Sequence, residues 1–106
     1  MTNREFIWIR WGKNPDKRER FREYCQNYLD GKTAWLELIP EPQNEYDPNA
    51  IKVFARGAVD GDVGYIGKEF AKRVGEIMRE AKSYECVGGA ILGDYRAEAL
   101  IKWVDK

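Results

Sequence analysis

The segment Glu41–Ala50, with the sequence EPQNEYDPNA, concentrates polar, aromatic and conformationally restricted residues between two apolar segments. An aromatic residue, Tyr46, and a carboxylate, Asp47, stand together in it. Loops mounted on rigid elements carry a disproportionate share of binding residues, so this pattern predicts a binding loop. The alternative is a structural corner, in which Asp47 accepts a hydrogen bond from the backbone two residues on and Tyr46 covers the core.

Several kinds of chemistry are excluded by residue type. The chain contains no histidine, so catalytic triads that use histidine as the base and histidine-ligated zinc sites are both excluded. Cys25 and Cys86 stand in no metal-ligand spacing and fall among apolar residues, so we expect two buried free thiols. Residues 60–62, Asp-Gly-Asp, match only a fragment of a calcium loop and predict a turn. We therefore expect no metal, no cofactor and no enzymatic activity.

The charge balance limits the possible partners. Eighteen cationic and eighteen acidic residues give a net charge of zero over 106 residues. Bulk attraction to nucleic acid or to an anionic membrane is therefore disfavoured, and phosphate contacts must come from a few local cations. The length predicts one domain, residues 1–106. The chain shows no signal-peptide pattern and no apolar run that could span a membrane, so we expect a cytoplasmic protein.

Apolar periodicity predicts the elements that would position the loop. Asn14 and Pro15 supply a cap and a first-turn proline for one helix, and Gly88-Gly89 predicts a bulge or bend of the kind that turns corners in small barrels. The order β-α-β-β-β-α-β-β favours a mainly β fold with two helices (α+β), a small six-stranded antiparallel OB-like barrel. The expected strands cover residues 6–11, 33–39, 51–55, 63–66, 84–92 and 97–104, and the expected helices cover 15–29 and 68–81.

The loop and its flanks resemble the HIRAN family. The sequence LIPEPQNEYDPNAIKV over Leu38–Val53 is followed by Val63–Ile66, VGYI, before a helix. The family pattern is an apolar strand, Glu-Pro-x-Asn-Pro-Tyr-Asp-x-Asn-Ala-Ile-x-Val, a short gap and Val-Gly-Tyr-Ile-Pro. The resemblance runs from about residue 6 to residue 81. Glu45 and Gly67 depart from it, because the family usually has proline at both positions.

The resemblance implies a modified oligonucleotide-binding barrel that captures the free 3′ end of single-stranded DNA. In fork-remodelling SNF2-type ATPases such a module guides a motor to a DNA end. It implies a role in DNA repair. The expected partner is a helicase, ATPase or nuclease that is encoded separately, and no membrane association is expected. Carried over residue by residue, the binding positions are Arg10, Trp11, Tyr46, Asp47, Tyr65 and Lys68.

These residue types suit a strand end. Aromatic rings such as Trp11 and Tyr46 stack on bases without reading sequence, and Arg10 and Lys68 can neutralise adjacent phosphates. The carboxylate of Asp47 can accept a hydrogen bond from a terminal 3′-hydroxyl, but it repels a 3′-phosphate or a continuing phosphodiester. Asp47 would therefore select strand ends by charge.

Other interpretations of the same residues stay open. Tyr65 alternates with apolar neighbours and can fill the core, and Arg10 can pair with Glu37 across strands. Exposed aromatics such as Trp8 and Trp35 also suit a protein-interaction adaptor that uses the barrel surface without binding DNA. A third interpretation is a metal-dependent nuclease built on Glu41, Asp47, Asp60 and Asp62.

Overall fold

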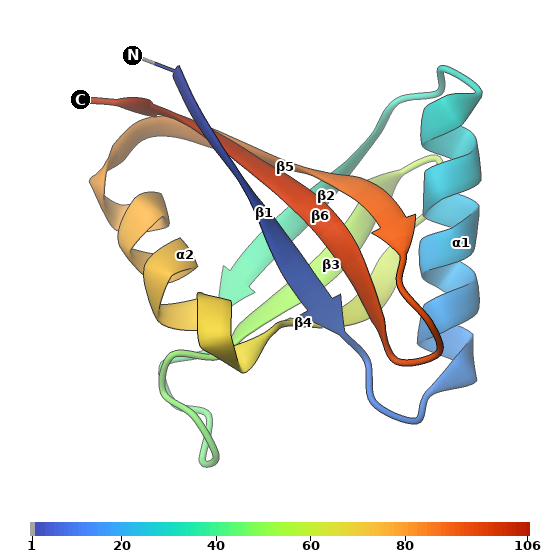
Figure 1. The fold of residues 1–106 in the computed structure, drawn as a ribbon, viewed down its shortest axis with the longest axis horizontal. Helices are drawn as coiled ribbons and strands as arrows, with labels where there is room; N and C mark the ends of the chain where they lie inside the picture. Colours follow the sequence, from blue (N-terminus) through green and yellow to red (C-terminus); the bar gives the residue numbers. More distant parts are fainter. Residues whose placement is uncertain (1) are drawn as a thin grey trace.

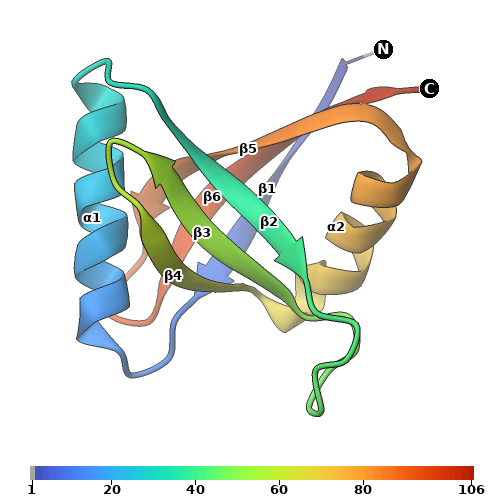
Figure 2. The same cartoon turned by 180° about the vertical axis from the view of Figure 1, so that it is seen from behind.

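Six antiparallel strands close into a barrel, and one helix lies on each of two sides (Figures 1 and 2). The computed structural model describes residues 2–106. Around the barrel the strands follow the order β1-β4-β3-β2-β5-β6. This confirms the predicted mainly β fold and its element order. The elements are β1 (Thr2–Arg10), α1 (Pro15–Leu29), β2 (Ala34–Pro40), β3 (Ile51–Gly57), β4 (Gly61–Ile66), α2 (Lys68–Glu80), β5 (Ala81–Ile91) and β6 (Arg96–Asp105).

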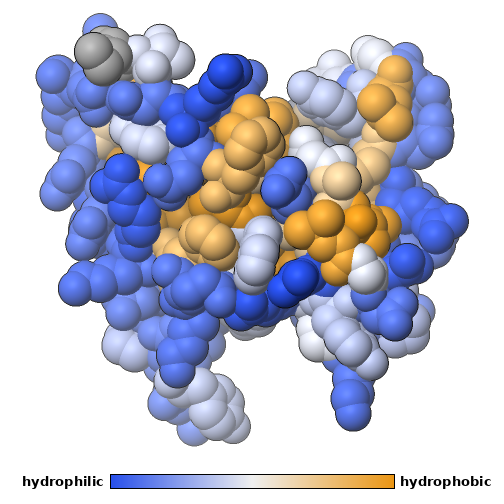
Figure 3. Space-filling view, in the orientation of Figure 1, coloured by the Kyte–Doolittle hydropathy of each residue, from blue (hydrophilic) through white to orange (hydrophobic). Residues whose placement is uncertain are grey.

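Alternation along the strands builds the core. In β1, Ile7 and Ile9 are fully buried, whereas Trp8 and Arg10 lie on the outer face, which is the period of two of a strand. The outer face of β1, β5 and β6 carries apolar side chains in its middle, surrounded by hydrophilic ones (Figure 3), and exposed Phe6 lies on it. None of the helices in residues 2–106 has the length and apolar character that a membrane crossing requires.

Helix α1 begins and packs as its sequence predicts, but its last turn does not. Asn14 Oδ1 accepts hydrogen bonds from the backbone N–H groups of Asp16 and Lys17, at 3.1 and 3.2 Å. Phe21 and Tyr24 are fully buried. The apolar residues of the last turn are not packed in the core, because this turn faces solvent and Leu29 is 78% exposed.

The two cysteines differ in their surroundings. Both are free thiols, as expected. Cys86 of β5 is buried, and this burial raises the pKa of its thiol to about 12. Cys25 is only half-buried, which corrects the expectation of two buried thiols, because α1 presents it at the margin of the packed face.

The bulge predicted at Gly88-Gly89 is present, and helix α1 packs against it. The pairing of β5 with β6 shifts register between Gly88 and Ala90. The Gly88 N–H donates to the hydroxyl of Tyr24 at 2.8 Å. A Cβ at residue 88 would lie 2.2 Å from Tyr24 Cε2, so only glycine admits the ring this closely.

Gly88→Ala is expected to lower the free energy of unfolding by about 1–3 kcal/mol, the usual effect of overpacking, because the new methyl group must displace the buried ring of Tyr24. Urea unfolding followed by tryptophan fluorescence measures the change. The matched control is Gly75→Ala in α2, where an added Cβ meets only Arg79 Nη1, at 3.3 Å. The free energy of unfolding of this control should rise by about 0.5–1 kcal/mol. Equal stabilities for the two variants would contradict the account.

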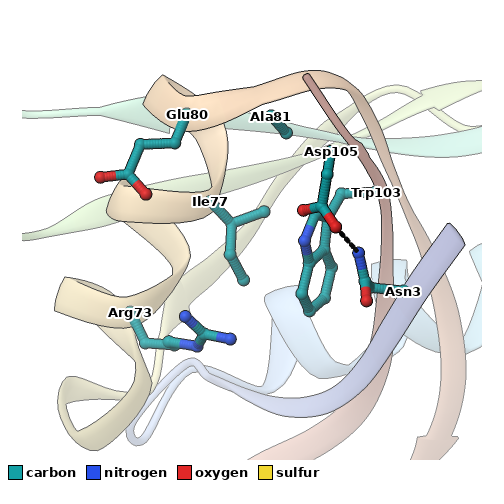
Figure 4. A pocket seen from close by; sticks show the side chains of 7 residues that line it. All are labelled: Asn3, Arg73, Ile77, Glu80, Ala81, Trp103 and Asp105. Atoms are coloured by element: carbon teal, nitrogen blue, oxygen red, sulfur yellow. Dashed lines mark hydrogen bonds between the residues drawn. The ribbon is translucent and has the colours of Figure 1, made fainter. Parts of the chain in front are cut away.

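Helix α2 covers the barrel close to the chain termini. One side of it faces a cavity of about 220 Å³, into which Arg73 and Ile77 of α2 project (Figure 4). The Arg73 guanidinium lies 5.7 Å from the ring centre of Trp103 in β6. Asn3 Nδ2 donates to Asp105 Oδ2 at 3.0 Å, which joins the ends of β1 and β6. The side chains of this cavity are therefore largely engaged with one another.

The shortest strand pairing among the described residues joins β2 to β5. Within residues 2–106, β2 pairs with β3 at seven register positions, from Ala34 to Pro40. It pairs with β5 at one position, Leu36 with Cys86. We call this contact the β2–β5 seam.

Candidate nucleic-acid interface

The loop between β2 and β3, residues 41–50, projects from the end of the barrel at which α2 begins (Figures 1 and 2). Its base is closed by the Glu41 N–H, which donates to the carbonyl of Ala50 at 2.9 Å. Asn44 organises the interior, because its Oδ1 accepts from the backbone N–H groups of Tyr46 and Asp47, at 2.9 and 3.0 Å. This structural role of Asn44 was not predicted. Its position two residues before Tyr46, typical of an Asx turn, was the available signal.

Asp47 uses one carboxylate oxygen in a local turn bond and leaves the other without a partner among residues 2–106. Its Oδ1 accepts a hydrogen bond from the Asn49 N–H at 2.8 Å, which is the local turn bond of the structural alternative. Between residues 2 and 106, no hydrogen bond or ion pair engages its second carboxylate oxygen. One oxygen therefore holds the turn while the other can accept from a ligand.

Glu41 ties the loop to the barrel wall. Its Oε1 accepts from the Tyr65 hydroxyl at 2.9 Å and from Asn44 Nδ2 at 3.1 Å. Its Oε2 lies 3.6 Å from Lys52 Nζ in β3. The hydrogen bond from Asn44, followed by that from Tyr65, lowers the pKa of Glu41 below its ordinary value. Burial, followed by the bond to Glu41, raises the pKa of Tyr65.

The lowered pKa of Glu41 predicts how the loop responds to acid. A depressed folded pKa means that the contribution of Glu41 is present above the ordinary value of 4.5 and is lost as the pH falls through the folded value. Side-chain amide NMR signals of Asn44 are expected to shift with a midpoint below 4.5. A midpoint for Asn44 at or above 4.5 would contradict the hydrogen-bond arrangement.

A cavity of about 440 Å³ lies between this loop, β1, β4 and the start of α2. We call it the end cavity. Arg10 of β1 and Tyr65 of β4 face each other across the strand pair, and Tyr46 is 90% exposed at the rim. Five of the six predicted binding residues therefore line one cavity. Its lining residues are Arg10, Asn44, Tyr46, Asp47, Ala50, Tyr65, Ile66, Gly67 and Lys68.

The structure does not bring Trp11 to the end cavity. Arg10 faces outward, so the next residue turns inward, and Trp11 is only 6% exposed. Its Nε1 donates to the carbonyl of Asp94 at 2.8 Å, and its ring centre lies 5.8 Å from that of Phe21. In this position the ring packs under α1 and has no free face for a base.

The two cations of the end cavity differ in what surrounds them. Lys68 forms no ion pair with any described residue and stands at the first position of α2. Arg10 Nη2 donates to Glu69 Oε2 at 2.8 Å, so the alternative pairing with Glu37 is wrong. The carboxylate of Glu37 is instead held by Arg56, at 2.7 Å.

Gly67 allows the contact between Arg10 and Glu69. A Cβ at residue 67 would lie 2.3 Å from Glu69 Oε1, so a side chain here would force that carboxylate to move. The Gly67 N–H also donates to the carbonyl of Trp8 at 2.7 Å, a bond that the proline of the family pattern could not form. Glycine at this position therefore leaves room for the Glu69 carboxylate that pairs with Arg10.

The acids of the nuclease interpretation are not assembled into a metal site. Across residues 2–106, no three candidate metal-ligating side chains come close enough to hold an ion. Glu41 is engaged with Tyr65 and Asn44, and Asp60 with Arg56 at 2.6 Å. The arrangement offers cations, aromatic rings and one free carboxylate oxygen, which suits binding.

Comparison with known proteins agrees with the geometry. The model of the HIRAN domain matches residues 21–94. A solved structure described as the crystal structure of the HIRAN domain of human HLTF superimposes with a TM-score of 0.65 at 19% identity, covering 98% of this chain and 77% of that chain. No curated protein matches. Since the family model covers most of the chain, the chain belongs to the HIRAN family, whose members are known as DNA-binding rather than catalytic modules.

Proposed function

We propose that this chain binds the free 3′-hydroxyl end of single-stranded DNA in the end cavity. Family membership supports nucleic-acid binding in general, and the selection of a strand end is the further step. The observation that carries it is the convergence of five residues from β1, the loop, β4 and α2 on one cavity. They supply two cations, two aromatic rings and a carboxylate.

Each group has a distinct task in this proposal. The second oxygen of Asp47 accepts from the 3′-hydroxyl, while Lys68 contacts a phosphate of the terminal nucleotides. The exposed ring of Tyr46 stacks on a base, a contact worth about 1–3 kcal/mol. The hydroxyl of Tyr65 is engaged with Glu41, so Tyr65 serves as a fixed wall of the cavity.

The proposal is tested with three ligands of identical sequence. Fluorescence anisotropy at low salt compares a 5′-labelled single strand ending in a 3′-hydroxyl with one ending in a 3′-phosphate. Closed circular single-stranded DNA, which has no end, serves as the competitor. We expect tight binding of the hydroxyl end, weak binding of the phosphate end and poor competition by the circle. Equal affinities for the two strand ends, or full competition by the circular DNA, would contradict recognition of a strand end.

Lys68→Ala is expected to weaken binding of both strand ends about equally, by roughly five- to tenfold at low salt, because one phosphate contact is lost. The slope of log K against log salt should fall by about 0.7, the value for one phosphate of a single strand. The matched control is Lys72→Ala, one helical turn further along α2 and outside the end cavity. An unchanged salt slope in Lys68→Ala would show that the lysine makes no phosphate contact.

A further inference from the structure

A second and larger groove lies on the other side of the β2–β3 loop, between α2 and the end of β2. Its volume is about 520 Å³. Ala50 lines both this groove and the end cavity, and Pro42 and Pro48 of the loop form one wall. We call it the α2 groove. None of the residues proposed to contact DNA lines it.

The floor of the α2 groove is apolar. Leu38 and Pro40 come from β2, Met78 from α2 and the exposed Tyr84 from the start of β5. Aliphatic and proline side chains dominate, and Tyr84 is the one aromatic residue among those that line the groove. Stacking platforms for bases require several rings, so this surface favours apolar side chains of a protein ligand over a nucleic acid.

The rim of the groove carries positive charge without compensation. Lys72 and Arg79 stand seven positions apart on α2, which places them on one side of the helix about 10 Å apart. In the described chain neither forms an ion pair, and no acidic residue lines the groove. On the opposite side of the helix, by contrast, Arg73 lies 3.9 Å from Glu5 (Figure 4 shows Arg73). In a chain with zero net charge, the two unpaired cations select an acidic ligand.

Backbone geometry favours an extended ligand. The β2–β5 seam pairs the two strands at Leu36 and Cys86, and no further register position follows toward Pro40 in the described residues. The end of β2 therefore presents one side to the groove without a strand beside it. Extended peptides bind such edges through main-chain hydrogen bonds, and pockets for alternate side chains provide specificity.

Gly75 keeps the groove open. It lies inside α2, where glycine costs about 0.5–1 kcal/mol relative to alanine. A Cβ there would meet only Arg79 Nη1, at 3.3 Å, so packing within the chain does not demand glycine. Its missing side chain instead leaves room between Lys72 and Met78 on the groove side of the helix.

We infer that the α2 groove binds a short extended segment of a partner protein that carries apolar side chains and two carboxylates. Residues two or four positions apart in a strand point to the same side and lie about 7 or 13 Å apart. These spacings bracket the separation of Lys72 and Arg79, whose flexible side chains cover the difference. The inference does not rest on DNA binding, because none of the residues proposed to contact DNA lines the groove.

The test begins with a library of random nonapeptides displayed on phage. The library is selected on the unchanged chain and depleted on Gly75→Leu, in which the new side chain fills the groove. Recovered peptides are synthesised with a fluorophore, and their affinities are measured by anisotropy. We expect apolar sequences with two carboxylates two or four positions apart. Binding should weaken at least tenfold in Gly75→Leu and about tenfold in the double variant Lys72→Gln, Arg79→Gln.

Two controls make the result decisive. Arg73→Gln removes a cation from the opposite side of α2 and should leave peptide affinity unchanged. The double variant leaves the groove floor intact, so it tests the inference even if Gly75→Leu fails to fold. The inference is overturned if no peptide is recovered, if recovered peptides lack carboxylates, or if they bind the double variant as well as the unchanged chain. Displacement of a peptide by single-stranded DNA, with the groove variants impaired in DNA binding, would assign the groove to nucleic acid.

Discussion

Asp47→Asn is expected to bind a strand with a 3′-phosphate at least tenfold more tightly than the unchanged chain does. Asparagine keeps an oxygen that can accept from the Asn49 N–H, a bond of 2.8 Å, so the turn is retained while the charge is removed. Two unit charges 4 Å apart repel by about 1 kcal/mol in water and about 4 kcal/mol near a protein surface. Binding of the 3′-hydroxyl strand should weaken about three- to tenfold, because the amide NH2 that replaces the second carboxylate oxygen is a donor and cannot accept from the hydroxyl.

Anisotropy with the two strand ends measures this discrimination as a ratio of affinities. Glu45→Gln is the matched control, because it removes an exposed acid from the same loop that does not line the end cavity. A general charge effect would change the ratio of affinities equally in Asp47→Asn and Glu45→Gln. If Asp47→Asn preserves the preference for the 3′-hydroxyl, another group makes the selection.

Glu69→Gln is expected to raise the affinity for single-stranded DNA about three- to tenfold. In the structure the Glu69 carboxylate is paired with the guanidinium of Arg10. The Arg10 side chain is 39% exposed and the Glu69 side chain is 45% exposed. Exposed pairs of this kind contribute up to about 1 kcal/mol, so a phosphate can displace the carboxylate but must compete with it. Glutamine removes both this competition and the repulsion of the incoming phosphate.

The affinity should rise by the same factor for the two strand ends. The slope of log K against log salt should become steeper by about 0.7, which corresponds to one more phosphate contact. Arg10→Gln combined with Glu69→Gln completes a double-mutant cycle, in which the gain disappears if it acts through Arg10. Glu76→Gln, on α2 but outside the end cavity, controls for net charge. A loss of affinity in Glu69→Gln would mean that Glu69 holds Arg10 in place for the ligand.

Local sequence patterns predicted the elements of the barrel. Apolar periodicity located the strands and helices, and the glycine pair at 88–89 located the bulge. The resemblance to the HIRAN family named the candidate binding residues, five of which line the end cavity. The elements depend on residues that are close in the sequence, whereas closure of the barrel pairs strands as distant as β1 and β6.

The remaining features depend on contacts between distant segments. The partner of Arg10 is fixed by the approach of α2 to β1, which brings Glu69 to it across 59 positions, and no local pattern encodes that approach. Trp11 was assigned by family position, whereas strand alternation and α1 direct its ring inward. The α2 groove arises from three elements whose spacing the sequence does not state.

The β2–β5 seam also bears on how the barrel moves. Local openings of a folded chain require free energies from near zero up to that of global unfolding, and weakly joined elements lie at the low end. β1 and β6 share nine register positions, from Thr2 to Arg10, whereas the seam has one, Leu36 with Cys86. The barrel is therefore expected to open first at its two short strand pairings, which are the seam and the two-position pairing of β1 with β4, while the longer pairings persist. A segment bound along β2 would slow the separation of β2 from β5.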